Sequence, residues 1–568
     1  MMEPLKSCVL LDCPNHQAHL EYLNRLRFFH RWRTVSIPLR PLRMDTLVDS
    51  VVSTVNSIKA ALQTVGQLSS DYNVVLSRIS QSPGIPSFPT TDSHWHNTVP
   101  ESARLLHASE ARLPGRADIV IIGSGITGAL IARALLEHPN TSDLKIVIVE
   151  ARDVCSGATG RNGGHIKCDP HLVYHKYNAL HGKEFAEKAT RFNMAHVDEL
   201  IRISEKIGGE ARTEARRVET VDAYFDSALF QRACKKVKTF QIDMPLESQH
   251  IKVLTGPEAQ KAFGLSSLCV GAITGHAGAI NPYKFVTGLL LFLEDKYPDR
   301  FHIISRCPVK DIKEPSNEDA YYTLETEKGL IITSHVIHAT NAHVGHLVPG
   351  LRAKIFPLRQ AMTAQSHRAF AQPLDSPRPG GRSFSFLYSE GFDYLTQRPD
   401  GTIMFGGGFA QSPQQGMIEV GVGTDDLYDP TGAAHICGAL SVLFKDPKHH
   451  VDVNDANYEN RVKSIWSGSL GTSADALPWV GRLPVRLTGR NVPPANKHSR
   501  IASPGEWVSA GYSGEGMVNA PLCAKALAMM ILKPNEDNVS SWFPEQMRVT
   551  ERRCKKADPS ALLQDLWD

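Results

Sequence analysis

The sequence lacks a strong excess of charge of either sign. Its 62 lysines and arginines face 59 aspartates and glutamates, which leaves a formal net charge of +3. So small a surplus gives no bulk electrostatic reason to bind nucleic acid, whose phosphates are recognised by clustered basic residues. No stretch reaches the roughly 18 consecutive apolar residues of a membrane-spanning helix. We therefore expect no nucleic-acid partner and no integral membrane span.

Cysteine motifs and internal repeats are also missing. The ten cysteines are dispersed, without a C-x-x-C pair or a cysteine and histidine cluster at zinc spacing. This pattern predicts free thiols in a reducing compartment and no metal site. No repeat with a period of about 20 to 50 residues is visible. At 568 residues the chain is long enough for two or three domains.

The N-terminal region is basic and rich in arginine. Residues 1–43 carry no acid after Glu21, a composition that loosely resembles an organellar transit peptide. Two alternatives stay open, a disordered arm and a translation start at Met44. The location we expect by default is cytoplasmic, with a mitochondrial location as the alternative.

Residues 44–116 are expected to form a helical extension and a linker. Apolar residues from Leu47 to Val65 recur at the spacing of an amphipathic helix. Residues 81–100 hold four prolines and little periodicity, which is typical of a linker or of an arm that wraps around the body of the protein.

A glycine-rich turn follows a strong strand signal. Ile119 to Ile122 has the length and β-branched content of a buried parallel strand. Gly123, Gly125 and Gly128 come directly after it, spaced as G-x-G-x-x-G. In such a motif the glycines permit a tight turn, close approach of backbone to a pyrophosphate and close packing of the following helix, whose positive end faces the phosphates. The turn predicts a bound dinucleotide.

A carboxylate ends the second predicted strand. Lys145 to Val149 is apolar and stops at Glu150, 22 residues after Gly128. An acid in this place accepts hydrogen bonds from a ribose 2′-hydroxyl and repels a 2′-phosphate, which disfavours NADP. These features alone allow NAD as readily as FAD.

The next segment, residues 150–165, reads EARDVCSGATGRNGGH. With it the chain resembles the FAD-dependent oxidoreductases of the D-amino-acid oxidase, glycine oxidase and sarcosine oxidase family, in a fungal or bacterial form with the ATGRNGGH motif. Three further segments match the family's pattern in order, CPVK at 307–310, HVIHATN at 335–341 and WVSAGYSGEGMVNA at 507–520. The resemblance covers Ala117 to about Leu532 and implies that the cofactor is FAD.

The resemblance also implies which residues hold FAD. Val309 would meet the adenine, and a helix start near Met517 would face the flavin, where its positive end stabilises the negative charge of reduced flavin. The expected cofactor residues are Gly123, Ser124, Gly125, Ile126, Thr127, Gly128, Glu150, Ala151, Arg152, Ser156, Thr159, Arg161, Asn162, Gly163, Gly164, Val309, Thr340, Asn341, Gly511, Tyr512, Ser513, Gly514, Gly516 and Met517.

The order of strand and helix signals, with the resemblance, predicts an α/β (α+β) fold. It comprises a Rossmann-like FAD-binding domain, an interleaved antiparallel-sheet substrate domain and the N-terminal helical extension. The expected boundaries are 117–171, 266–351 and 459–535 for FAD binding, 172–265 and 352–458 for substrate binding, and 536–568 for a C-terminal tail.

For the reaction, the resemblance implies oxidation of a C–N bond by hydride transfer to flavin. The expected substrate is an amine, an amino acid or an N-methyl amine, and dioxygen is the expected acceptor, which gives an imine and hydrogen peroxide. We predict three catalytic candidates: His276 in the segment GHAGAINPY, Arg359 after Pro357, and Arg398 beside a Pro-Asp-Gly hairpin turn. An arginine there would pair with a substrate carboxylate, or would be an exposed hairpin residue.

Several alternatives stay open. One alternative to amine oxidation is an FAD-dependent dehydrogenase or monooxygenase that acts on a specialised secondary-metabolite substrate. Another is a flavin-stabilised scaffold without enzymatic activity. The absence of a second G-x-G-x-x-G counts against an enzyme with two dinucleotide sites. No cysteine lies between Cys437 and Cys523, which disfavours flavin attached through cysteine. His165 is either a flavin-contacting residue or a satisfied loop histidine.

Overall fold

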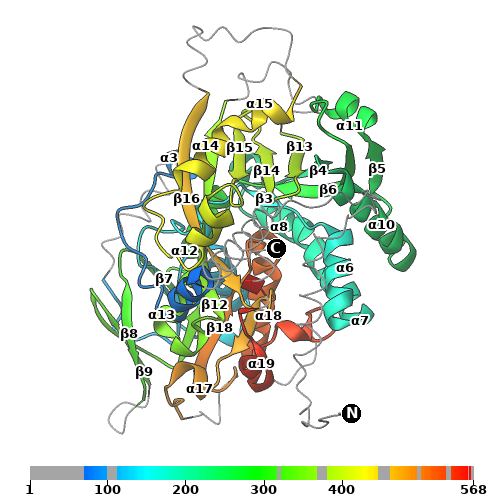
Figure 1. The fold of residues 1–568 in the computed structure, drawn as a ribbon. Coiled ribbons are helices and arrows are strands. Elements are labelled where there is room, and N and C mark those ends of the chain that lie inside the picture. The colour runs from blue at the N-terminus through cyan, green and yellow to red at the C-terminus, as the bar shows by residue number, and fades with distance from the viewer. Residues whose placement is uncertain are drawn as a thin grey trace, which may run out of the picture. The chain divides into compact units, whose positions relative to one another are not determined.

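The structure is a computed structural model that describes residues 70–98, 112–315, 321–366, 380–445, 461–494, 500–532, 539–560 and 562–563 (Figure 1). The chain divides into two compact units, Met1–Asp71 and Tyr72–Asp568. The second unit contains every element discussed below. The predicted basic arm and the predicted helix from Leu47 to Val65 lie outside the described residues.

A six-stranded sheet joins segments that are far apart in the sequence. Its strand order is β17-β18-β11-β1-β2-β7. All neighbours pair in parallel except β17 and β18, which are antiparallel. The bounds are β1 Ile119–Ile122, β2 Ile146–Val149, β7 Phe301–Ile304, β11 His335–His338, β17 Trp479–Arg482 and β18 Gly505–Ala510. The predicted Rossmann-like fold is confirmed.

The strands of this sheet are covered on both faces. Ile119 and Ile121 pack in one core with helices α5 (Ile126–Leu136), α12 (Pro282–Lys296) and α18 (Ala520–Leu532). Val120 and Ile122 face the other way, toward a three-stranded antiparallel sheet, because side chains alternate along a strand. That sheet consists of β8 Val309–Lys313, β9 Tyr322–Thr326 and β10 Gly329–Thr333. Burial on both faces explains why β1 and β2 are apolar throughout.

A second, mostly antiparallel sheet has nine strands in the order β16-β12-β15-β14-β13-β4-β6-β3, with β5 paired to β6. Strands β6 and β16 lie here, although the sequence places both in segments expected to bind FAD, so those segments contribute to two sheets. The bounds are β3 His165–Ile166, β4 Arg216–Tyr224, β5 Lys252–Thr255, β6 Gly271–Ala279, β12 Ile355–Gln365, β13 Arg382–Leu387, β14 Phe392–Gln397, β15 Ile403–Gly407 and β16 Val462–Ser473.

The two faces of the nine-stranded sheet differ in chemistry. One face is apolar, with Val221, Phe384 and Phe405 packed against helices α11 (Gly256–Phe263), α14 (Pro430–Gly438) and α15 (Leu440–Leu443). The alternate residues form a second face that we call the polar face. It is defined by Thr220, Asp222, Ser383, Ser385, Tyr394 and Thr396, which are register partners or alternate along β4, β13 and β14.

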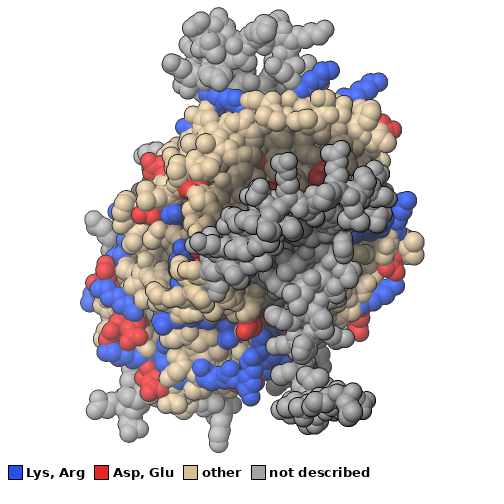
Figure 2. All heavy atoms as spheres, viewed as in Figure 1, with Lys and Arg blue, Asp and Glu red and all other residues tan. Residues whose placement is uncertain are grey.

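The remaining described helices lie around these sheets. Their bounds are α3 His94–Asn97, α6 Pro170–His181, α7 Lys183–Met194, α8 His196–Glu205, α9 Gly209–Thr213, α10 Ser227–Asp243, α13 Val344–Leu347, α17 Val485–Thr488 and α19 Glu551–Lys556. On the visible face, basic and acidic side chains are intermixed and lie mainly in the lower half (Figure 2). No helix within the described ranges is long and apolar enough to span a membrane.

The proline-rich segment is a wrapping arm. Its preceding helical turns bury Val75 and Ile79 beside Phe356. Farther along, the Trp95 side chain is 1% exposed, and its Nε1 donates to the carbonyl oxygen of Asn162 at 2.6 Å. We call residues 72–98 the arm. It is bonded to the body along its length and is not a free linker.

Candidate active site

The glycine turn packs so closely against neighbouring backbone that there is no room for a Cβ atom at two of its glycines. Gly123 has a φ of 107°, and a Cβ there would lie 2.8 Å from the carbonyl oxygen of Ala339. A Cβ on Gly128 would lie 2.0 Å from the carbonyl oxygen of Gly123. The first two turns of α5 can therefore approach β1 and β11 closely. This arrangement aims the N-terminal N–H groups of α5 into a pocket.

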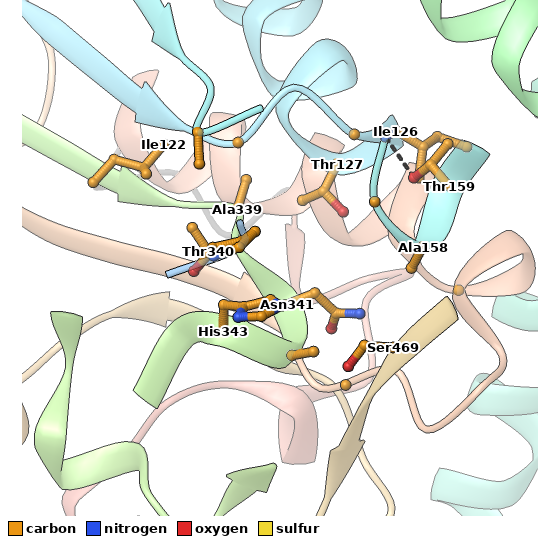
Figure 3. Close-up of a pocket in the computed structure, with 18 of the residues that line it drawn as sticks. Ile122, Ile126, Thr127, Ala158, Thr159, Ala339, Thr340, Asn341, His343 and Ser469 are labelled. Atoms are coloured by element: carbon orange, nitrogen blue, oxygen red, sulfur yellow. Dashed lines mark hydrogen bonds between the residues drawn. The ribbon is translucent and has the colours of Figure 1, made fainter. Parts of the chain in front are cut away.

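The pocket is large and extends from this turn between the two sheets. Its empty space, with the open mouth included, is about 1380 Å³. In Figure 3, Thr127, Thr340 and Asn341 are gathered around one space, and the N–H of Ile126 donates to Thr159 Oγ1 at 3.1 Å. The expected cofactor residues that line it are Gly123, Gly125, Ile126, Thr127, Glu150, Ala151, Arg152, Thr159, Asn162, Val309, Thr340, Asn341, Tyr512, Gly514, Gly516 and Met517.

The other expected cofactor residues lie behind the lining, namely Ser124, Gly128, Ser156, Arg161, Gly163, Gly164, Gly511 and Ser513. Several of them support residues of the lining. Ser124 donates to a Glu150 carboxylate oxygen from its N–H at 2.9 Å and from its hydroxyl at 2.7 Å. The N–H of Gly511 donates to Asn341 Oδ1 at 2.9 Å. These residues position the pocket wall and do not form it.

Arg161 is used entirely inside the protein. Its side chain donates to the carbonyl oxygens of Ser156 at 2.7 Å, Ser467 at 2.9 Å and Thr91 at 3.0 Å. Burial lowers the pKa of Arg161 to about 10, so the group stays charged, and its Nε lies 3.1 Å from Asp425 Oδ2. The structure therefore shows Arg161 holding together several segments of the protein, and its contact with FAD stays a prediction.

Asp425 is a pocket residue that the sequence did not reveal. It lines the pocket and binds Arg152 through two hydrogen bonds, of 2.7 and 2.9 Å. The two residues are 273 positions apart, and nothing in the local sequence marks the pair. The same holds for other lining residues that sequence analysis missed, which include Gly84, Ile85, Pro86, His343, His346, Ser469, Leu470 and Gly471.

The residues present fit FAD. The end of α5 supplies N–H donors for a pyrophosphate, and the Glu150 carboxylate lies at the end of β2, where a ribose is bound in dinucleotide folds. The hydroxyl of Thr340 is buried in the lining and has no hydrogen-bond partner within the described part of the chain. A buried polar group without a partner costs about 1 to 3 kcal/mol, and a bound cofactor rich in polar groups would supply one.

His276 is not brought to this pocket. It lies on β6 opposite Glu219, on the face of the nine-stranded sheet that carries the apolar side chains. The His276 side chain is exposed, and its ring stacks on that of His250 with the centroids 3.9 Å apart. Side chains alternate along a strand, so its neighbours Gly275 and Ala277 lie on the polar face and His276 does not. A residue one position earlier or later in β6 would face the side on which we expected His276.

The two candidate arginines are already paired with carboxylates. Arg398 is buried and binds Glu214 with Nη2 at 2.7 Å and Nε at 3.1 Å. Burial would raise the pKa of Glu214, but the Arg398 hydrogen bonds lower it to about 2. Arg359 binds Glu419 with two bonds, of 2.5 and 3.1 Å. Neither arginine lines the pocket, and neither has the free guanidinium that pairing with a substrate carboxylate requires.

The double-glycine loop instead lies against the polar face. A Cβ on Gly163 would lie 2.7 Å from the Tyr394 ring and 3.2 Å from the methyl group of Met362. The hydroxyl of Thr396 donates to the carbonyl oxygen of Gly163. His165 follows on β3, and burial lowers its pKa to about 3, so the ring is neutral. Its Nε2 is buried and has no hydrogen-bond partner among the described residues.

Comparison with known proteins agrees with this geometry. A model of the family described as "FAD dependent oxidoreductase" (DAO) matches residues 118–530. The probable oxidoreductase OrdL of Rhizobium meliloti (strain 1021) is 23% identical over 461 residues, which is 80% of this chain and 90% of that relative.

Solved structures share the fold. Glycine oxidase from Geobacillus kaustophilus is 15% identical with a TM-score of 0.52, over 76% of this chain and 98% of the other. L-proline dehydrogenase from P. horikoshii is 20% identical with a TM-score of 0.51, over 78% of this chain and 100% of the other. Since the family model spans the chain from β1 into α18, the protein belongs to the DAO family of FAD-dependent oxidoreductases.

Proposed function

We propose that the protein oxidises the C–N bond of a small amine, an amino acid or an N-methyl amine, with dioxygen as the electron acceptor, and releases an imine and hydrogen peroxide. The observation that carries this proposal is the contact of the double-glycine loop with the polar face. Thr396 and Tyr394 lie beside Gly163, and the opposite face of the sheet carries Phe384 and Phe386 of β13 in an apolar core. The names of the two structural relatives, which refer to glycine and L-proline, are compatible with such a substrate.

Different residues of the site bind the cofactor and the substrate. Bound FAD supplies the two-electron acceptor of this chemistry. The end of α5, Glu150 and Thr340 hold the cofactor, while Gly163 keeps the loop flat enough for backbone to lie close to it. The polar face binds and orients the substrate, which is the main contribution a protein makes to hydride transfer. His165, being neutral, adds no positive charge that would repel an ammonium group.

The test is anaerobic mixing of the purified yellow protein with a panel of primary, secondary and N-methyl amines and amino acids. Bleaching of the flavin absorption band by a member of the panel is the expected result. Readmission of air then restores the band and produces peroxide if the enzyme is an oxidase. Restoration only by a dye would point to a dehydrogenase. A yellow protein that no member bleaches, and that NAD(P)H does not reduce, would refute amine oxidation and favour a scaffold.

A further inference from the structure

Three charged side chains meet on the polar face. Lys167 Nζ lies 2.7 Å from Asp169 Oδ1, donates to Ser385 Oγ at 2.7 Å and contacts Asp222 Oδ1. The carboxyl of Asp222, when protonated, donates to Asp169. Asp222 and Lys167 have side chains 6% and 7% exposed, whereas that of Asp169 is 34% exposed. The cluster is therefore closed on the sheet side and open at Asp169.

Strand register places this cluster near the double-glycine loop. Asp222 is the register partner of Ser385, which is the partner of Tyr394, whose ring lies against Gly163. Neighbouring strands are about 4.8 Å apart, so Asp222 is about 10 Å from the strand that contacts the loop. Lys167 approaches from the same side, because it follows Gly163 by only four positions. The cluster and the double-glycine loop therefore lie on the same side of the sheet.

Unpartnered polar groups lie beside the cluster. Thr220 and Ser383 are register partners, 4% and 0% exposed, and share the face of Asp222. Neither hydroxyl has a hydrogen-bond partner among the described residues, and the same is true of His171 Nε2 at the start of α6. Since buried polar groups are nearly always hydrogen-bonded in native proteins, these atoms mark a place where a polar ligand or water completes the structure.

The charge state of the cluster is unusual. Burial raises the pKa of Asp222 to about 7, and the Asp169 charge adds to this effect while Lys167 opposes it. Lys167 holds the pKa of Asp169 below its ordinary value in spite of burial. Asp222 thus exchanges its proton near neutral pH, whereas Asp169 stays ionised.

The other groups around the cluster leave this picture unchanged. Burial lowers the pKa values of His165 and His171 to about 3 and about 4, and it raises those of Tyr224 and Tyr394, so all four are neutral at pH 7. The other charged or titratable groups near it among the described residues are Lys167, Cys168, Asp169, His175, Lys176, Lys236 and Glu515, and burial raises the pKa of the Cys168 thiol. The described surface is hollowed in the upper half of Figure 2, below the position of β13 to β15, with acidic side chains in its depth.

We propose that Asp222 and Asp169, which Lys167 holds together, form the site that binds the protonated nitrogen of the substrate, and that the Asp222 carboxylate accepts one proton from it. This inference rests on the proposed amine oxidation and adds its recognition step. The N–H bond breaks with its electron pair left on nitrogen, and an O–H bond forms on Asp222. The proton is then held between Asp222 and Asp169, and the neutral amine has the lone pair that hydride loss from the adjacent carbon requires.

Binding is tested without turnover. The FAD-loaded protein is titrated with tert-butylamine and with α,α-dimethylbenzylamine, which have no hydrogen on the carbon beside nitrogen and cannot be oxidised there. The uncharged tert-butanol is the comparison, and the change in the flavin spectrum is the signal. We expect the amines to bind at least ten-fold more tightly than the alcohol. Asp222→Asn should abolish this preference while retaining FAD.

The matched control is Glu219→Gln. Glu219 lies on the same strand but on the opposite face, where it binds Arg382 at 2.8 Å, so its loss should leave amine binding unchanged. If Asp222→Asn fails to hold FAD, the more exposed Asp169→Asn takes its place, with the same expected loss of preference. Amine binding that both variants retain would overturn the inference, even where amines still bleach the flavin.

Proton acceptance has its own readout. Because the acceptor must be unprotonated, the rate of flavin reduction by an active amine should rise with pH through about 7. This rise should occur at a lower pH than the rise that deprotonation of the free amine causes. In Asp222→Asn this lower limb should vanish and the rate should fall by about 10²- to 10⁴-fold. An unchanged limb would refute the acceptor role. Selective amine binding without reduction by any amine would keep the binding site and refute the proposed function.

Discussion

The arm is expected to be part of the cofactor site, and replacement of Trp95 tests this. Trp95→Ala should weaken both folding and the retention of FAD. The side chain is 1% exposed, and its Nε1 is bonded to the carbonyl oxygen of Asn162, which lines the pocket. A change on the arm therefore reaches the loop that faces the cofactor through a single hydrogen bond and the packing around it.

The size of the effect follows from two contributions. Removal of a buried tryptophan side chain to alanine costs about 3 to 5 kcal/mol. Loss of the indole N–H leaves the Asn162 carbonyl without its donor, at a further cost of about 1 kcal/mol. Trp95→Phe keeps most of the packing and loses the donor, so its effect should be about 1 to 2 kcal/mol. An exposed residue on the same arm, Val74, which is 59% exposed, should tolerate alanine within about 0.5 kcal/mol.

The assay follows urea unfolding by circular dichroism and FAD release by flavin fluorescence in the same samples. We expect Trp95→Ala to release FAD at lower urea than it unfolds, because the pocket wall loosens before the body does. Trp95→Phe should lie between this variant and the natural protein. The reasoning is refuted if Trp95→Ala keeps FAD to the same urea concentration as Val74→Ala.

Further variants test other parts of the site. Gly163→Ala should lower FAD affinity or slow flavin reduction by at least ten-fold, since its Cβ would overlap the Tyr394 ring; unchanged values in a reduction assay would contradict the close approach. Glu214 has its pKa lowered to about 2 from 4.5, so its pair with Arg398 should add about 3 kcal/mol of stability above pH 4.5 that is lost toward pH 2, and Glu214→Gln should flatten this acid dependence in thermal unfolding. His276→Ala should leave the rate of flavin reduction within two-fold, and a larger loss would place this residue in the site after all.

The parts of the site that sequence analysis predicted depend on local signals. The turn at Gly123 requires glycine because its backbone has a positive φ and touches another strand, and both demands appear in the spacing of three glycines. Val309, Thr340 and Met517 were expected from short motifs, and all three line the pocket. In each case the chemical reason for the residue lies within a few positions of it.

The parts that were not predicted depend on contacts between distant segments. Arg398 was interpreted as a free cation because its partner Glu214 is 184 positions away. His276 was expected in the site, but alternation along β6 turns it to the other face of the sheet. The polar face is likewise invisible in any one strand, since it becomes a surface only when β4 and β13 lie side by side in register. Pairing of strands, and not composition, decides these features.

The arm is made long before one of the residues to which it is bonded. The N–H of Thr91 donates to the carbonyl oxygen of Asp425 at 2.8 Å, across 334 positions of sequence. At about 5 to 20 residues per second, a ribosome makes the second partner roughly 17 to 70 seconds after the first. For that time the segment around Thr91 lacks this hydrogen-bond partner. Docking of the arm is therefore completed only after residue 425 has been made.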